Sequence, residues 1–321
     1  MNRIEKKHNV LVTGAGGPAG VNAIRLLSLR DDVHICATDI DPLAAGQLHA
    51  HQFETMERLS DRVAYNSSLQ DLLTKWNIDV LIPTVHEELF YVRDAKGDHP
   101  SAMFLSSQEA LRLGDDKHAL YEWASTHVPE YIGGWQLLSD ELRLEGNELF
   151  LKPVQGRGAR GCRVITRDEA AFLREHEGEN ASNWLLMEVL PGTEWSVDTY
   201  IAHDGTFVYV VPRERLALTG GISIKGKTVR HEQVISQTKD LLSREEFRGP
   251  VQVQWKADKN SNPKLVEINP RLSGGLMITK AAGADPIDCM LRELFGEHLE
   301  ETLWEEKVVV GFLQYQELNN E

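Results

Sequence analysis

The sequence of 321 residues is poor in cysteine and has no long apolar run, two features that mark several large protein classes. It contains three cysteines, Cys36, Cys162 and Cys289, and their spacing fits neither a zinc site nor a redox pair. No apolar run approaches the ~20 residues of a membrane-spanning helix, and Met1–His8 lacks an apolar signal segment. These absences argue against a disulfide framework and a membrane partner, and they lead us to expect a cytoplasmic protein.

Positive charge is also scarce. Lys and Arg together number 34 against 49 Asp and Glu, so the formal net charge is −15. A chain this acidic is poorly suited to nucleic acid, whose binding depends on neutralising phosphates. We therefore expect small-molecule partners, bound in a local basic pocket, and a homodimer as the commonest assembly.

The chain is long enough for two or three domains, since single cores rarely grow beyond ~250 residues, and 41% of its residues are hydrophobic. Its first part alternates short apolar strands with helical segments, a pattern that predicts a parallel α/β domain ending near Leu113. The predicted strands are Asn9–Thr13, Val33–Thr38, Asp79–Ile82 and Ala102–Ser106, and the first helix is Val21–Leu29.

A glycine-rich turn, Gly14–Gly20, joins the first strand to that helix. Thr13-Gly14-x-x-Gly17-x-x-Gly20, with Asp39 after the second strand, fits the nucleotide loop of NAD(P)-dependent epimerases and reductases. Such enzymes need a tyrosine four residues before a lysine, and no tyrosine here has one. The glycines are also compatible with close packing of helix on strand, or with an anion of a substrate.

A second glycine-rich segment, Gln155–Gly161, lies between the predicted strands Leu149–Val154 and Cys162–Ile165. Backbone amides in such a loop can fold over a triphosphate while Lys152 directs a charge at the same anion. A loose surface hairpin with a solvated lysine is the alternative. Upstream, Asp115-Asp116-Lys117 is expected to lead a helix that continues through Trp123.

The segment Glu188–Glu194 follows a predicted strand, Trp184–Met187, and precedes another, Trp195–Ile201. Its Pro-Gly bend is typical of a connector between two lobes. The backbone of residues 188–190 is suited to pairing with a flat base and Glu194 to accepting from ribose hydroxyls, although each acid taken singly is typical of a plain surface residue.

The run Lys264–Arg271 carries the strongest chemical signal. Glu267 and Asn269 lie two residues apart on an otherwise apolar strand, so their oxygens share one face and suit magnesium. The alternating segment Val251–Trp255 is expected to pair with it as a hairpin, and Gln254 or Gln252 is placed to add an oxygen. Without these partners, the motif is equally compatible with an edge strand that ends in a polar turn.

Taken in order, the Asp-Lys helix, the Lys-Pro strand with its glycine loop, the Glu-x-x-Pro-Gly-x-Glu connector and Glu-x-Asn-Pro-Arg resemble the ATP-grasp superfamily. The resemblance runs from about Asp115 to Phe295 and is nearest to the carbamoyl-phosphate-synthase large-subunit branch and its carboxylate–amine ligase relatives. It implies an N-terminal Rossmann-like α/β pre-ATP-grasp domain at 1–113 and a two-lobed grasp, with the small lobe at 114–187 and the metal-binding lobe at 188–321.

The resemblance also implies roles for individual residues. Arg271 and Lys152 would act on the transferred phosphoryl group, and ATP would bind with magnesium, two ions in number, or with manganese in its place. The implied nucleotide contacts are Lys117, Lys152, Gly156, Gly158, Gly161, Glu188, Val189, Leu190 and Glu194, and the implied metal ligands are Gln254, Glu267 and Asn269.

Substrate-facing residues are expected at Arg213, Arg215, Ser273 and Gly274. For the two arginines, surface ion pairs with nearby acids are an equal alternative. Of the two arginines, only one is expected to face inward from a straight strand. At the carboxyl edge of the first domain, His86 or Glu88 is placed to meet an amine, with capping of the next helix as the alternative for the acid.

Two departures shape the functional expectation. The chain has one grasp module and no glutaminase segment, so carbamoyl phosphate synthesis is not expected. The resemblance instead implies a carboxylate–amine ligase that forms an acyl phosphate and releases ADP and phosphate; the acid and the amine are not identified. An NAD(P)-dependent epimerase or reductase and a non-catalytic nucleotide-binding regulator are the alternatives. A further strand is expected at 307–315, with no assigned role.

Overall fold

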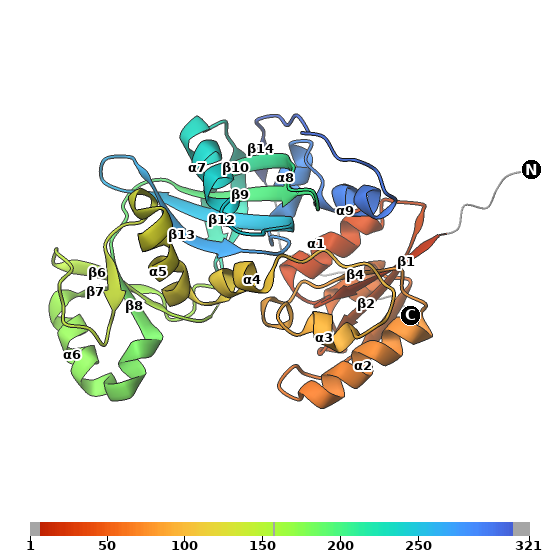
Figure 1. Cartoon of the computed structure of the whole chain (residues 1–321), viewed down its shortest axis with the longest axis horizontal. Coiled ribbons are helices and arrows are strands. Elements are labelled where there is room, and N and C mark those ends of the chain that lie inside the picture. Colours follow the sequence, from red (N-terminus) through yellow and green to blue (C-terminus); the bar gives the residue numbers. More distant parts are fainter. Residues whose placement is uncertain (1–6, 157, 311–321) are drawn as a thin grey trace, which may run out of the picture.

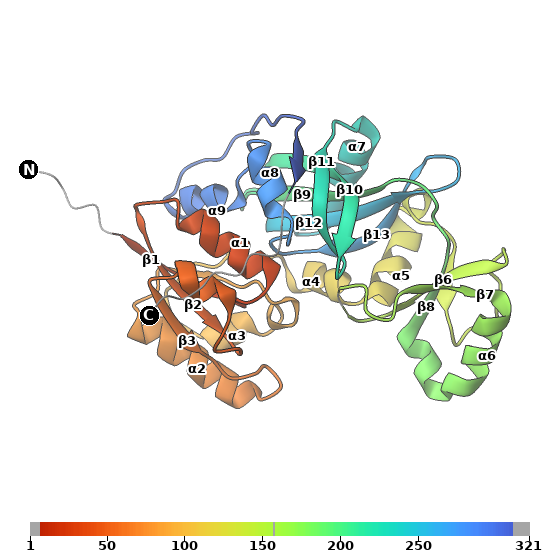
Figure 2. The same cartoon turned by 180° about the vertical axis from the view of Figure 1, so that it is seen from behind.

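The computed structural model describes residues 7–156 and 158–310, which form three β-sheets with helices packed around them (Figure 1). Seen from the opposite side, the three sheets remain distinct, with α4 and α5 between them (Figure 2). The helices are α1 (Pro18–Leu27), α2 (Arg62–Lys75), α3 (Val92–Lys96), α4 (Gln108–Asp115), α5 (Lys117–His127), α6 (Arg167–Glu177), α7 (Glu232–Leu242), α8 (Leu276–Ala281) and α9 (Pro286–Leu294), with short 3-10 helices at Ala45–His49, His86–Glu88, Pro129–Tyr131 and Gly178–Asn183. Within the described ranges no helix has both the length and the apolar character needed to cross a membrane.

The N-terminal sheet is parallel, as expected, with strand order β3-β2-β1-β4. Its strands are β1 (His8–Thr13), β2 (Val33–Asp39), β3 (Gln52–Thr55) and β4 (Val80–Ile82). The predicted strand at Ala102–Ser106 is wrong, because only Ala102 bridges to Val80. Beyond it the chain turns away, and Ser106 exchanges hydrogen bonds with the backbone of Arg248.

Helix α1 begins within the glycine-rich turn and connects two parts of the molecule. Pro18 is its first residue, where proline's missing N–H costs nothing and its fixed φ suits a helix. A Cβ at Gly20 would lie 2.1 Å from the carbonyl oxygen of Gly14, so only glycine allows this approach of helix and strand. The buried side chains of α1 share one core with the parallel sheet, with β9 and β10 and with α9.

The second sheet is antiparallel, with strand order β5-β8-β6-β7, and α6 packs against it. Its strands are β5 (Trp135–Leu137), β6 (Glu148–Pro153), β7 (Arg163–Thr166) and β8 (Trp184–Glu188). The predicted pairing of the two strands around the glycine loop is confirmed, since β6 and β7 are antiparallel neighbours.

The third sheet has strand order β13-β12-β9-β10-β11-β14, all neighbours being antiparallel. Its strands are β9 (Glu194–Ile201), β10 (Phe207–Thr219), β11 (Ile222–Thr228), β12 (Gly249–Ala257), β13 (Pro263–Asn269) and β14 (Val308–Val310). The predicted hairpin of Val251–Trp255 with the Lys264–Arg271 run is confirmed as the β12–β13 pair. Strand β14 falls within the predicted 307–315 strand, whose residues 311–315 lie outside the described residues.

Candidate functional site

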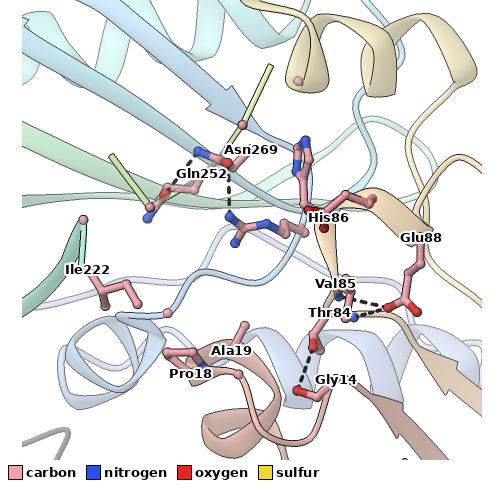
Figure 3. A pocket seen from close by; sticks show the side chains of 18 of the residues that line it. Gly14, Pro18, Ala19, Thr84, Val85, His86, Glu88, Ile222, Gln252 and Asn269 are labelled. Carbon is pink, nitrogen blue, oxygen red and sulfur yellow. Dashed lines mark hydrogen bonds between the residues drawn. The ribbon is translucent and has the colours of Figure 1, made fainter. Parts of the chain in front are cut away.

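A cavity of about 970 Å³ opens where the carboxyl edge of the parallel sheet faces the six-stranded sheet. Its wall combines the glycine turn after β1, the loop between β6 and β7, the β10–β11 hairpin and the strand pair β12–β13. Figure 3 shows Pro18 and Ala19 at the start of α1 on one side and Gln252 and Asn269 on another. Segments far apart in the sequence therefore share one chamber.

The register of the antiparallel sheet places the polar residues of this wall in rows. Glu267 lies opposite Gln254, Gln254 opposite Ser196, and Ser196 opposite Arg213. Two residues along, Asn269, Gln252 and Asp198 form the next row. Successive residues of a strand alternate faces, so both rows point to the same side of the sheet.

Glu267, Asn269 and Arg271 are joined directly by hydrogen bonds. The Asn269 amide donates to Glu267 Oε1 at 2.9 Å, and the Arg271 guanidinium donates to Asn269 Oδ1 at 3.2 Å. Burial favours a neutral Glu267, but the charges of Lys117, Lys152 and Arg271 and the Asn269 hydrogen bond outweigh it and hold the pKa of Glu267 below its usual range. The carboxylate is therefore ionised and available to a cation.

The donor set fits a magnesium ion that arrives with phosphates. Glu267, Asn269 and Gln254 present one carboxylate and two amide groups to the cavity, all oxygen ligands of the kind that hard cations take. Within residues 7–156 and 158–310, no three His, Cys, Asp or Glu side chains come together as a metal cluster. One carboxylate suits magnesium whose remaining ligands are substrate phosphates and water.

Two lysines lie beside this acid. Lys152 is buried and donates to the carbonyl of Val266 at 3.0 Å, while Lys117 donates to the carbonyl of Gly156 at 2.9 Å. Burial lowers the pKa of Lys152 to about 7, although the charge of Glu267 raises it. Lys117 lines the cavity, and Lys152 lies just behind the β13 backbone.

The helix that carries Lys117 begins at that residue and continues past Trp123. Asp116 is its N-cap and accepts from the backbone N–H of Ala119 at 3.0 Å. Asp115 instead ends α4 and pairs with Nε2 of His86 at 3.2 Å, so its carboxylate is engaged across the cavity. The cap at Asp116 fixes Lys117 at the first helical position.

The loop between β6 and β7 reaches the cavity and touches the β10–β11 hairpin. Gly156 and Gly158 line the cavity, whereas Gly161 packs against Trp184. A Cβ on Gly221 would lie 3.0 Å from the carbonyl carbon of Gly158, which shows how closely the two backbones approach. Arg157 lies outside the described residues.

The predicted base and ribose residues lie outside the lining of this chamber, although Glu194 contacts one lining residue, Arg215. Glu188, Val189, Leu190 and Glu194 are not part of its wall. Glu188 donates its N–H to the carbonyl of Gly134 at 3.0 Å, which continues the β5–β8 ladder. Glu194 pairs with Arg215 at 3.0 Å and with Lys256 at 3.8 Å. Their roles toward a nucleotide stay predictions.

Arg213 and Arg215 both line the cavity, so the expectation that only one would face inward is wrong. Residues two apart on a strand share a face, which brings both guanidinium groups to the same side. Arg213 donates twice to Asp198, each at 3.0 Å, and Arg215 donates to Ser196 at 2.9 Å.

Of the other two predicted substrate residues, Gly274 lines the cavity. Ser273 lies behind it, within 3.4 Å of the Arg213 guanidinium. Sequence reasoning missed Ser196 and Asp198. Their signal was present, since polar residues at every second position of an otherwise apolar strand mark one face.

At the edge of the parallel sheet, the carboxylate of Glu88 is used in hydrogen bonds within the protein. It accepts from the backbone N–H of Thr84 at 3.0 Å and of Val85 at 2.9 Å, and from the hydroxyls of Tyr65, at 2.8 Å, and Thr13. Burial raises the pKa of Glu88 against the opposing effect of these bonds. The capping alternative thus describes Glu88 better than a contact with an amine.

The carboxylate of Asp39 is likewise used by its own loop, accepting from the N–H of Gly16 at 2.7 Å and of Asp41 at 3.0 Å. If this domain bound a dinucleotide, the same carboxylate would be needed to accept from a ribose hydroxyl. Here its bonds hold the glycine turn and the end of β2 together.

The fold is that of several solved enzymes, at low sequence identity. N5-carboxyaminoimidazole synthetase from Staphylococcus aureus, complexed with ADP, superposes with a TM-score of 0.72 at 15% identity over 96% of this chain and 82% of that one. The biotin carboxylase domain of Hydrogenobacter thermophilus 2-oxoglutarate carboxylase, a dimer with MgADP, ADP and bicarbonate, gives 0.73 at 15% identity over 91% and 71%. L-amino acid ligase from Bacillus licheniformis gives 0.68 at 12% identity over 90% and 74%.

Sequence comparison gives a family as well. Residues 180–315 match a family described as ATP-grasp in the biosynthetic pathway with Ter operon. No curated protein sequence matches the chain. The family match covers the connector Glu188–Glu194 and strands β10 and β13, and the structural likeness covers 96% of the chain. Residues 180–315 therefore match an ATP-grasp family in sequence, and the chain shares its fold with the solved enzymes named above.

Proposed function

We propose that the protein is an ATP-dependent carboxylate–amine ligase that works through an acyl phosphate. The observation that carries this proposal is the meeting of Glu267, Asn269, Arg271 and Lys117 in one cavity, with Lys152 behind its wall. Phosphoryl transfer depends on positioning and on neutralising phosphate oxygens, and this set offers cations and a metal-binding carboxylate together.

In the proposed reaction a carboxylate oxygen of the substrate attacks the γ-phosphorus of ATP. The bond to the bridging oxygen breaks, and ADP leaves. A neutral amine then attacks the acyl carbon, phosphate departs, and the amine nitrogen loses a proton as the amide forms. No protein nucleophile is required. Bound magnesium would neutralise phosphate charge, held to the protein through Glu267, Asn269 and Gln254.

The chain's own residues have distinct parts in this proposal. Lys117 and Lys152 neutralise phosphate oxygens, and Arg271, already bonded to Asn269 at 3.2 Å, is placed to follow the transferred phosphoryl group. The glycine loop and the β10–β11 hairpin, which touch near Gly158 and Gly221, exclude water from the acyl phosphate. In this proposal the backbone of residues 188–190 binds adenine and Glu194 binds ribose. The proposed domains are the N-terminal α/β domain at 1–113, the small lobe at 114–187 and the metal-binding lobe at 188–321.

Binding is tested by thermal unfolding of the wild type and of Glu267→Ala, with Mg-ADP, a non-hydrolysable Mg-ATP analogue and NADH compared. A ligand at ~100 times its dissociation constant stabilises the native state by about 2.7 kcal/mol. Glu300→Ala, at an exposed acid, is the matched control. We expect magnesium nucleotide to raise the Tm of the wild type and the control and to act weakly on Glu267→Ala.

A second measurement tests turnover. ADP release is followed while carboxylic acids are supplied with and without amines. Release that needs an acid and increases with an amine supports the ligase. Stabilisation by NADH alone would move the function to the Gly14–Gly20 loop, and nucleotide binding without ADP release from any acid would favour the regulatory alternative.

A further inference from the structure

Two sets of hydrogen-bond donors at the cavity wall have no use in the phosphoryl-transfer chemistry proposed above. One is the guanidinium of Arg213, on β10. The other is the N-terminus of α1, which follows the glycine turn Gly14–Gly20. Both lie against Gly274 and Gly275, so they share one corner of the chamber.

Arg213 is 0% exposed, yet one of its nitrogens has no partner. Nε and Nη2 donate to Asp198, and Nη2 also approaches Ser273. Among the described residues, nothing accepts from Nη1. A buried charged donor without an acceptor is costly unless a ligand satisfies it. Asp198 cannot turn to it easily, because Thr279 also holds that carboxylate.

The N-terminus of α1 offers further donors. The first N–H groups of a helix have no intrahelical acceptor, and the helix dipole favours an anion there. Gly17, the N-cap, supplies no side-chain cap, and Pro18 has no N–H. This leaves the N–H groups of Ala19 and Gly20 at the start of a helix of ten residues.

Gly274 and Gly275 bring these two donor sets together. A Cβ on Gly275 would lie 2.6 Å from Nη1 of Arg213, and a Cβ on Gly274 would lie 3.3 Å from Pro18. Asn22, on α1, also donates to the carbonyl of Gly274 at 3.0 Å. In Figure 3, Ile222 lies on the same side of the chamber as Pro18 and Ala19.

This corner is distinct from the phosphoryl-transfer end. Arg213 and Glu267 lie in one row but three strands apart, which at ~4.8 Å per strand is about 14 Å between their Cα atoms. A chemical group of the ligand that is bound at Glu267 and Arg271 is therefore not the same group as one bound at Arg213. The nearest acids are already engaged, Asp198 with Arg213 and Asp39 with the N–H of Gly16.

We propose that Arg213 Nη1 and the N-terminus of α1 form an anion subsite for a second, non-reacting acidic group of the substrate. The inference rests on the proposed ligase function, in which the reacting carboxylate lies at the Glu267 strand. The substrate acid then carries at least two anionic groups, the second being a carboxylate or a phosphate ester. The glycine turn serves this group rather than a dinucleotide.

The test is a calorimetric titration of the full chain with inorganic phosphate and, separately, with malonate. The protein is first saturated with magnesium and a non-hydrolysable ATP analogue, so that the nucleotide phosphates are already in place. Arg213→Gln removes the free donor, and Ala19→Asp puts a carboxylate at the helix N-terminus, a position where acids are favourable for folding. Lys227→Gln, on β11 and paired with Glu214, loses the same charge away from the cavity and is the control.

We expect phosphate, malonate or both to bind the wild type and the control, and to bind each cavity variant at least tenfold more weakly, while the analogue binds all four proteins equally. The anion that binds more tightly identifies the chemical source. Failure of both anions to bind, or equal binding in all four proteins, overturns the subsite. If the analogue itself does not bind, the ligase proposal fails, and the same comparison without nucleotide still decides the subsite.

Discussion

Gln254 is a neutral amide in the row that contains Glu267 and Arg213. A carboxylate at this place would give the cavity a second negative ligand directly across the β12–β13 ladder from the first. With the amide, the protein alone offers a cation one charge, so we expect magnesium to bind measurably only together with nucleotide phosphates. The residue thus sets how strongly metal and nucleotide binding depend on each other.

Gln254→Glu is expected to lower, by several-fold, the magnesium concentration needed for half-maximal nucleotide binding. The added carboxylate faces Glu267, so a cation between them gains charge that the amide lacks. Nucleotide binding is measured calorimetrically over a magnesium series. Gln233→Glu, exposed on α7, is the control and should match the wild type. An unchanged or raised magnesium requirement in Gln254→Glu would show that Gln254 does not face the metal.

Lys152 is expected to take up a proton when nucleotide binds. Burial lowers the pKa of Lys152 to about 7, so at pH 8 most of the free protein holds it neutral. A phosphate bound in the adjoining cavity favours the charged form and raises that pKa again, which draws a proton from solution. At pH 6 the lysine is already charged, and little uptake is expected.

Proton uptake is measured by titrating Mg-ADP at pH 8 and pH 6 in buffers of different ionisation enthalpy. Lys152→Met should abolish the uptake at pH 8, and Lys264→Met, at a lysine that bonds the backbone of Glu130 near the surface, should leave it unchanged. Equal uptake in wild type and Lys152→Met would assign the proton to another group.

At the scale of elements, the strands with clear alternation or strong turn chemistry were predictable. The β12–β13 hairpin and the β6–β7 pair follow from local pattern, because their cross-strand partners are near in sequence. β3 escaped prediction because Gln52–Thr55 is short and largely exposed, and it pairs only through β2. The segment after Ala102 was misassigned because its partner, Arg248, is far away in the chain.

In the candidate site, too, some residues could be placed from the local sequence and others could not. Glu267 and Asn269 share a face of β13, and Arg271, two residues beyond the end of that strand, bonds back to Asn269. The facing rows of Ser196, Asp198 and Arg213 depend on the register of β9 and β10 with their neighbours, which no local pattern specifies. The approach of α1 to Gly274 depends on tertiary packing and was equally out of reach.

The junction of β1 and α1 gives a prediction about stability. Gly20→Ala would place a Cβ 2.1 Å from the carbonyl oxygen of Gly14, a backbone contact that cannot give way cheaply. We expect a loss of about 1–3 kcal/mol in the free energy of unfolding, as for other overpacked positions. Gly17→Ala, where the nearest atom is 3.4 Å away, is the control. Urea unfolding of both variants measures the difference, and equal stability of the two would contradict a tight junction.

The cavity is enclosed by parts that belong to different sheets. The loop between β6 and β7 extends from the small antiparallel sheet, and the hairpin tip Gly220-Gly221 extends from the six-stranded sheet. Their backbones meet near Gly158, at the wall of the cavity. We expect this contact to govern how well the chamber excludes water.

Gly221→Ala tests this contact, because its Cβ would lie 3.0 to 3.3 Å from the backbone of Gly158 and Ala159. The position also has a φ of +77°, which strains any other residue, so Gly296→Ala, with a φ of +78° and no atom within 4 Å, is the matched control. We expect Gly221→Ala alone to weaken nucleotide binding several-fold and to speed tryptic cleavage after the exposed Arg160. If both variants lose stability equally and keep wild-type cleavage at Arg160, backbone strain explains the effect and the two tips do not close the chamber together.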